Sequence, residues 1–293
     1  MYELRQITEN CFYIDCPAKI GVVKTGDNTV CLIDSGLDKD IAKKVKHQLD
    51  ELGLNITAIY NTHSNADHVG GNKYIQDKTG CKIYAPASEW AFTRYPILEP
   101  AYLYGGFPPK ELRSKFFVAE TSDAAELTED ALPEGFKIIK LPGHFFDMVG
   151  FLTPDGVAYI ADCISSKATL EKYAIGVVVD VEAYIKTLEE LPKIGAKYYV
   201  PSHAEVSEDI KELADYNIAA TKKNIEKITE LLREEKTFDE LIKALFDDME
   251  HRLNFQQYAL VGSTIRSYLT YLLDKGEVVY EVIDNRLLWR SLV

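Results

Sequence analysis

Short runs of β-branched and aromatic residues alternate with charged, helix-period segments over the first two-thirds of the chain. Strands are predicted at residues 12–14, 21–23, 29–33 and 56–60. A helix is predicted from about Lys39 to Leu52, because apolar side chains recur there every three or four positions. Similar strand and helix signals alternate up to His203. This alternation is typical of an α/β fold.

The pattern changes in the last third of the chain. The predicted elements are a long charged helix at 208–235, helices near 238–246 and 259–275, and a hairpin that turns at Asp284 and Asn285. Gly276 is expected to end the last helix. We therefore expect a main domain of residues 1–207, a connecting helix of residues 208–235 and a small α+β module of residues 236–293.

Residues 87–119 interrupt the alternation. Aromatic side chains are interleaved there with Gly105, Gly106 and a Pro-Pro pair, which excludes one continuous helix. Two interpretations stay open. The aromatic residues either anchor a surface insertion or form a lid or pocket wall, since long loops in compact domains often have a function. In the second case Tyr102 and Tyr104 are the candidate residues of a substrate pocket.

The 293 residues include 33 basic and 46 acidic side chains, which gives a formal charge of -13. This balance argues against a sequence-independent nucleic-acid surface, because phosphate binding needs clustered Lys and Arg. The five cysteines lack metal-type spacing, and Cys31, Cys81 and Cys163 are interpreted as small buried residues. No leader-like N-terminus or membrane-length apolar run is visible. We expect a soluble, cytoplasmic protein.

The segment at residues 61–71 carries the densest chemistry. It reads Asn-Thr-His-Ser-Asn-Ala-Asp-His-Val-Gly-Gly and directly follows the predicted strand 56–60. Its metal-binding groups would be His63, Asn65, Asp67 and His68. Imidazole nitrogen and carboxylate oxygen, brought together this tightly, are what a transition metal needs. The Gly-Gly pair is expected to let the backbone turn and pass close to a bound ion.

Further candidate ligands follow predicted strands elsewhere in the chain. They are His144 after the strand 136–140, Asp162 after the strand 157–161, and His203 after the strand 197–201. Asp34 similarly follows the strand 29–33. The chain has only six histidines, and four of them are among these candidate ligands. A metal site is therefore predicted.

Together these residues resemble the metallo-β-lactamase superfamily, whose signature is T-H-x-H-x-D-H-x-G-G. Every fixed position matches except one, where Asn65 replaces the second histidine of the family. The resemblance implies a four-layer αββα sandwich, and the last segment resembles the winged-helix module of some members. It also implies two metal positions: the first with His63, Asn65 and His144, the second with Asp67, His68 and His203, and Asp162 bridging them.

Zinc is the expected metal, as one or two ions. An amide oxygen is a harder and weaker ligand than imidazole, so the first position is expected to bind weakly, to stand empty or to prefer manganese or iron. Zinc lowers the pKa of a bound water towards about 7, and the resulting hydroxide would attack an ester, thioester or lactone. If the first position is vacant, Asp67 or Asp162 is expected to act as general base.

The favoured hypothesis is a metal-dependent hydrolase of a small molecule. One alternative is an RNA or phosphodiester hydrolase that holds RNA with its C-terminal module, although the acidic balance from Lys236 onward counts against nucleic acid. Another is a non-catalytic, metal-dependent binding or sensing protein, in which Asn65 marks the loss of catalysis. For the module itself, a structural cap or a homodimer contact is the preferred role.

Overall fold

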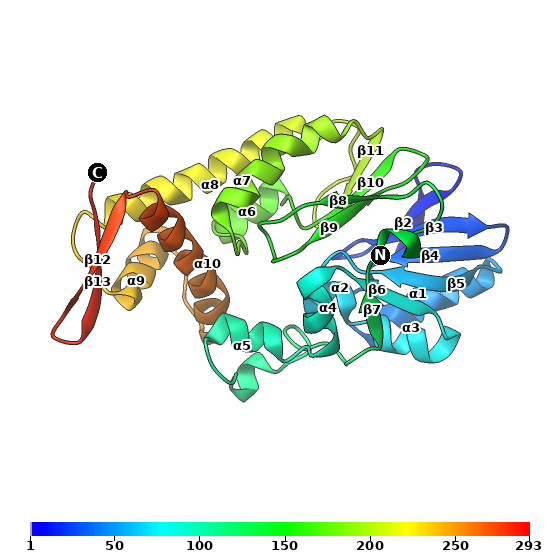
Figure 1. Cartoon of the computed structure of the whole chain (residues 1–293), viewed down its shortest axis with the longest axis horizontal. Helices are drawn as coiled ribbons and strands as arrows, with labels where there is room; N and C mark the ends of the chain where they lie inside the picture. The colour runs from blue at the N-terminus through cyan, green and yellow to red at the C-terminus, as the bar shows by residue number, and fades with distance from the viewer. Residues whose placement is uncertain (1) are drawn as a thin grey trace.

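The computed structural model describes residues 2–293 and contains two large β-sheets, which lie on the right in Figure 1, with the C-terminal elements on the left. The first sheet contains, in spatial order, β1 (Glu3–Gln6), β2 (Cys11–Asp15), β3 (Ile20–Gly26), β4 (Thr29–Ile33), β5 (Asn55–Tyr60), β6 (Lys82–Ala85) and β7 (Ala124–Glu126). The second contains β11 (Tyr198–Pro201), β10 (Val157–Ala161), β9 (Val149–Leu152) and β8 (Lys137–Lys140). Pairing is parallel from β4 to β7 and between β10 and β11, and antiparallel elsewhere.

Alternation along β4 explains why the first sheet has two apolar faces. Val30 and Leu32 belong to the outer cluster of buried side chains, whereas Cys31 and Ile33 belong to the cluster between the sheets. Successive strand residues point to opposite faces, so an unbroken apolar run fits a strand that is covered on both sides. The cluster between the sheets also contains Tyr159 of β10, and the two sheets therefore share one core.

Helices cover the outer face of each sheet. The outer face of the first sheet is covered by α1 (Lys39–Glu51) and α3 (Asn72–Thr79). Val45 of α1 and Ile75 of α3 are buried in the outer cluster. The second sheet is covered by α7 (Val181–Glu190) and α8 (Lys211–Leu231), with α6 (Lys167–Tyr173) and the short η3 (Leu191–Ile194) beside them. The predicted αββα sandwich is confirmed.

The aromatic-rich insertion forms three short helical segments rather than one helix, as its composition predicts. They are α4 (Ala87–Arg94), α5 (Leu98–Tyr104) and η1 (Lys110–Leu112); the short η2 (Glu129–Ala131) follows β7. Leu103, Leu112 and Phe117 form a small buried cluster with Ala259, which lies in α10 (Phe255–Asp274). The insertion is thus packed against the last third of the chain.

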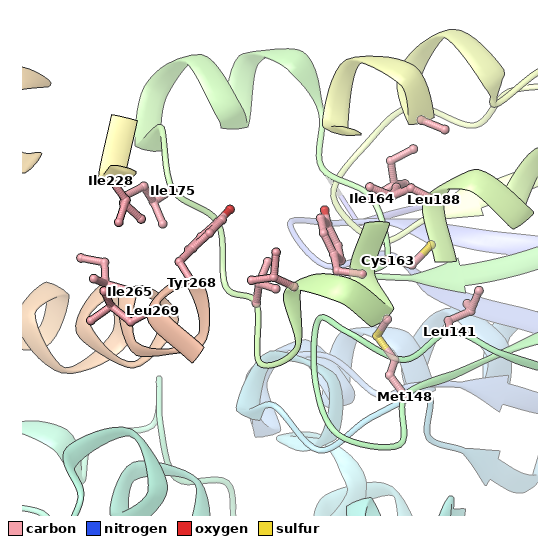
Figure 2. Close-up of a cluster of buried hydrophobic side chains, with 14 of the residues drawn as sticks. Leu141, Met148, Cys163, Ile164, Ile175, Leu188, Ile228, Ile265, Tyr268 and Leu269 are labelled. Carbon is pink, nitrogen blue, oxygen red and sulfur yellow. The ribbon is translucent and has the colours of Figure 1, made fainter. Parts of the chain in front are cut away.

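The last third contains α9 (Phe238–Asp248), α10, and a hairpin of β12 (Val278–Ile283) and β13 (Arg286–Ser291). Gly276 has a φ of 72° and follows the end of α10, as predicted. One buried cluster runs from Ile164, which follows β10, through Ile228 of α8 to Ile265 and Tyr268 of α10 (Figure 2). The helix α8 is therefore packed both on the second sheet and on α10.

All five cysteines are buried and have free thiols, including Cys31, Cys81 and Cys163. Within residues 2–293, no helix combines the length and the apolar character that a membrane crossing requires.

Candidate metal centre

The seven predicted site residues lie together where strands of both sheets end. The loop after β5 carries His63 and Asn65 and leads into α2 (Ala66–Val69), which carries Asp67 and His68. The other three follow β8, β10 and β11, and are His144, Asp162 and His203. Strand ends of one sandwich meet along a common edge, so residues as much as 140 positions apart in the chain converge there.

Asp162 lies between three imidazoles. Its Oδ1 is 3.2 Å from His68 Nε2, and its Oδ2 is 3.2 Å from His203 Nε2 and 3.8 Å from His144 Nε2. Asp67 Oδ2 lies 3.3 Å from His203 Nε2. Asp162 therefore lies within 3.8 Å of three of the four predicted histidines, and its bridging of two metal ions stays a prediction.

Each of the four imidazoles is held through its Nδ1 atom. The oxygen partners are Thr62 Oγ1 for His63 (3.0 Å), Asp34 Oδ2 for His68 (2.8 Å), the Val177 carbonyl for His144 (3.0 Å) and the Pro17 carbonyl for His203 (2.7 Å). Such partners fix the ring orientation and the tautomer of metal-binding histidines. The Nε2 atoms face the site, where those of His68 and His203 lie 3.2 Å from the oxygens of Asp162.

Whether a metal fits can be judged from the atoms that face the site. Several of them lack a well-aligned hydrogen-bond partner. His63 Nε2, His68 Nε2 and Asp162 Oδ1 are buried and make no well-aligned hydrogen bond to any described residue, although His68 Nε2 and Asp162 Oδ1 lie 3.2 Å apart. Buried polar atoms are normally paired. Ligand atoms of His63, His144 and Asp162 lie within 4.8 Å of one another, as do those of Asp67, His68 and His203. This donor set fits two neighbouring divalent ions.

Electrostatics also favour a cation here. Burial opposes charge on Asp67, yet His68 and His203 hold the pKa of this carboxyl down to about 2. Burial is likewise outweighed at Asp162, where His203 and His68 keep the pKa well below its usual value. Asp162 is the main cause that raises the pKa of His203 to about 10. Burial lowers the pKa of His63 well below its usual value, which keeps that imidazole neutral and able to donate a lone pair.

The glycine pair of the motif has a different role from the one predicted. Gly70 and Gly71 have ordinary right-handed helical φ and ψ, so neither supplies a special turn. A Cβ on Gly70 would lie 1.8 Å from the Leu37 carbonyl oxygen, and one on Gly71 would lie 2.3 Å from that of Ser35. The glycines are required because α2 packs directly on the backbone that follows Asp34.

Two buried carboxylates of the insertion were missed by the sequence reasoning. Glu89 of α4 accepts hydrogen bonds from the backbone N and Oγ of Ser64, and Glu99 of α5 accepts one from Asn65 Nδ2. Both are almost inaccessible to solvent. The only signal in the sequence is that each is the single acidic residue of a short, aromatic-containing helix.

A cavity of about 840 Å³ opens beside the loop that carries His144. Tyr102 and Tyr104 line it, together with Gly143, Phe145 and Phe146 of that loop and with Ser263, Ser267, Thr270 and Tyr271 of α10. Tyr102, Phe145 and Phe146 contact one another edge to face. The insertion, the His144 loop and the C-terminal module thus share one cavity.

An αββα sandwich with histidines and aspartates at one edge defines a class of metal-binding proteins. The chain belongs to the metallo-beta-lactamase superfamily, whose sequence model matches residues 13–203.

Similar proteins agree with this assignment. The chain is 30% identical to a hydroxyacylglutathione hydrolase of Maricaulis maris over 45% of its own length and 44% of that protein. It is 26% identical to a hydroxyacylglutathione hydrolase of Hyphomonas neptunium over 56% of its length and 57% of that protein. The chain spans about half the length of the curated relatives it matches.

Solved structures extend the likeness over the whole chain. A metallo-beta-lactamase family protein from Thermus thermophilus has a TM-score of 0.75 at 19% identity and covers 98% of this chain and 100% of its own. A beta-lactamase domain protein from Burkholderia ambifaria has a TM-score of 0.77 at 13% identity and covers 99% of this chain and 93% of its own. At these identities the likeness shows the fold, and it includes the C-terminal module.

Proposed function

We propose that this protein is a zinc-dependent hydrolase of a small thioester or ester. The observation that carries the proposal is the arrangement of three imidazoles around Asp162, together with the buried Nε2 of His63, which has no hydrogen-bond partner among the described residues. The names of the curated relatives support a thioester substrate, because hydroxyacylglutathione carries its acyl group on sulfur.

The chain's residues would divide between two metal positions. His63, Asn65 and His144 would hold the first ion, and Asp67, His68 and His203 the second; Asp162 lies between the two groups. A bound zinc ion would supply an acidified water and a Lewis acid for the carbonyl oxygen.

Two carboxylates are suited to proton transfer when the first position is empty. The Asp67 side chain is 38% exposed, whereas that of Asp162 is only 12% exposed. Solvent therefore reaches Asp67 more easily, and Asp67 would accept the proton of the attacking water. Asp162 would chiefly keep His68 and His203 in place. General bases of this kind must lie within hydrogen-bonding reach of the water that they activate.

The cavity beside His144 would hold the part of the substrate away from the reacting carbon. Its aromatic side, with Phe145, Phe146 and Tyr102, suits an apolar group, and the hydroxyls of Ser263 and Ser267 on α10 suit a polar one. A contribution of α10 to this cavity supports a capping role for the C-terminal module rather than a nucleic-acid surface.

The test is hydrolysis by the purified chain, loaded with zinc or manganese. The substrate panel contains a hydroxyacylglutathione, a nitrophenyl ester, a lactone and a phosphodiester. We expect turnover of the thioester or the ester, lost on chelation and restored by metal, and lost in the Asp67→Ala variant. Metal binding without turnover of any of the four would instead favour the binding or sensing role.

A further inference from the structure

The side chain of Asn65 is turned away from the helix that it precedes. Asn65 is the N-cap of α2, a position where an asparagine side chain usually accepts a hydrogen bond from the first turn. Here it makes no such bond. Nδ2 instead donates to Glu99 Oε1 at 2.7 Å, and Oδ1 lies 3.2 Å from His144 Nε2. The amide therefore has two distinct ends, one on the insertion and one in the site.

The contact between Asn65 and His144 joins two acceptors. His144 Nδ1 lies 3.0 Å from the Val177 carbonyl, which can only accept, so Nδ1 carries the hydrogen. In the neutral ring Nε2 then presents a lone pair towards Asn65 Oδ1. Reversing the amide would only move the conflict while Glu99 is ionised, because Oδ1 would then face a carboxylate oxygen, which can only accept. A cation bound by Oδ1 and Nε2 removes the conflict.

The contact with Asn65 is the one polar interaction of the buried Glu99 side chain among the described residues. That side chain is 6% exposed, and among residues 2–293 its carboxylate has only one hydrogen-bond partner, Asn65. Burying a carboxylate for one hydrogen bond is costly, and an apolar side chain would pack there at lower free energy. Glu99 belongs to none of the three groups of closely spaced ligand atoms in the site, so its contact with the metal centre passes through Asn65.

We propose that Glu99 is a positioning residue, which holds the Asn65 amide so that Oδ1 completes an oxygen-and-imidazole site for a divalent cation with His63 and His144. The insertion helix α5 is thereby linked to the affinity of the first metal position. The inference rests on the metal centre and not on the hydrolytic reaction, so it can hold even if no tested ester or thioester is cleaved.

Equilibrium titration of the metal-free full chain with zinc and with manganese, against a competing chelator, tests the proposal. Glu99→Leu is expected to lower the affinity for the more weakly bound metal ion (the weaker equivalent) by about 10–100-fold, as loss of a hydrogen-bond partner of a metal ligand does. The affinity for the more tightly bound ion should stay unchanged. Glu99→Gln is the matched conservative variant. Its amide oxygen can still accept from Asn65 Nδ2, so it is expected to retain the affinity of both equivalents.

A double-mutant cycle separates positioning from a structural role. Asn65→Ala removes the oriented amide, so it should lower the affinity for the same, more weakly bound ion. Adding Glu99→Leu to Asn65→Ala should not lower this affinity further. Equal weakening of both equivalents by Glu99→Leu, or an additive effect in the Asn65→Ala background, would overturn the proposal. If Glu99→Leu does not fold, Glu99→Gln and Asn65→Ala decide: loss of the weaker equivalent in Glu99→Gln, or its full retention in Asn65→Ala, refutes it.

Discussion

Replacing Gly143 by alanine tests how the loop that carries His144 is built. Gly143 has a φ of 123°, and a Cβ there would lie 2.4 Å from the backbone N and Cα of Tyr184. The Gly143 carbonyl also accepts hydrogen bonds from the backbone N–H groups of Val179 and Asp180, at 2.8 and 3.1 Å. The loop therefore cannot move away from α7 without breaking these bonds.

Two effects destabilise the folded state when alanine replaces Gly143, and their free energies add. A left-handed backbone costs an alanine about 1–2 kcal/mol. Overpacking against a rigid neighbour costs a further 1–3 kcal/mol or so. We therefore expect Gly143→Ala to lower the free energy of unfolding by about 2–5 kcal/mol, the sum of the two. It should also weaken the metal position that uses His144, because that residue directly follows the displaced backbone.

Gly53→Ala is the matched control. Gly53 has a φ of 69°, and a Cβ there would meet nothing within 4 Å, so only the backbone cost applies. Urea unfolding of the metal-free variants, followed by tryptophan fluorescence, gives the two free energies, and a zinc titration gives the affinities. Equal destabilisation by Gly143→Ala and Gly53→Ala, with equal metal binding, would refute the close approach of the loop to α7.

Four further outcomes are expected. Asp67→Ala and His203→Ala should each abolish tight binding of one ion, measured by metal content after dialysis; full retention in both would show that the second position is wrongly assigned. Asn65→His should raise zinc affinity at the first position, because imidazole is a softer ligand than an amide, and a titration that shows no gain would contradict this. Gly70→Ala should prevent folding, seen as loss of the cooperative unfolding transition, since its Cβ would lie 1.8 Å from a backbone oxygen. Burial raises the pKa of Glu89 from 4.5 to about 7, so its contribution to stability is present below pH 4.5 and is lost as the pH rises through 7. Relative to Glu89→Gln, the metal-free protein should lose about 3 kcal/mol between those limits, and a constant difference in urea unfolding would refute this.

The convergence of the candidate ligands could be predicted from the sequence, because each follows a strand whose apolar pattern is strong. His144, Asp162 and His203 come directly after or shortly after such runs, and strand ends converge whatever the loops between them do. The unusual residue Asn65 was equally visible as a departure from the motif. The anchors of the imidazole rings were less visible, since two of them are backbone carbonyls, those of Pro17 and Val177.

Glu89 and Glu99 could not be predicted, because their burial depends on contacts with residues 25 and 34 positions away. A glutamate in a helix is normally solvent-exposed, and its sequence neighbours do not reveal a partner in a distant loop. The role of Gly70 and Gly71 was predicted wrongly for a similar reason. The motif shows that small residues are needed, whereas only the packing of α2 on residues 35–37 shows what they must avoid.

Counting the metal ions in the purified chain is the most direct test of the proposed metal centre. Elemental analysis after purification without added metal, and again after reconstitution with zinc, manganese or iron, gives the number and identity of ions per chain. We expect at least one tightly held ion at Asp67, His68 and His203, and a second, weaker ion at the Asn65 position. A chain that binds no ion after reconstitution would contradict the metal centre and the hydrolase proposal together.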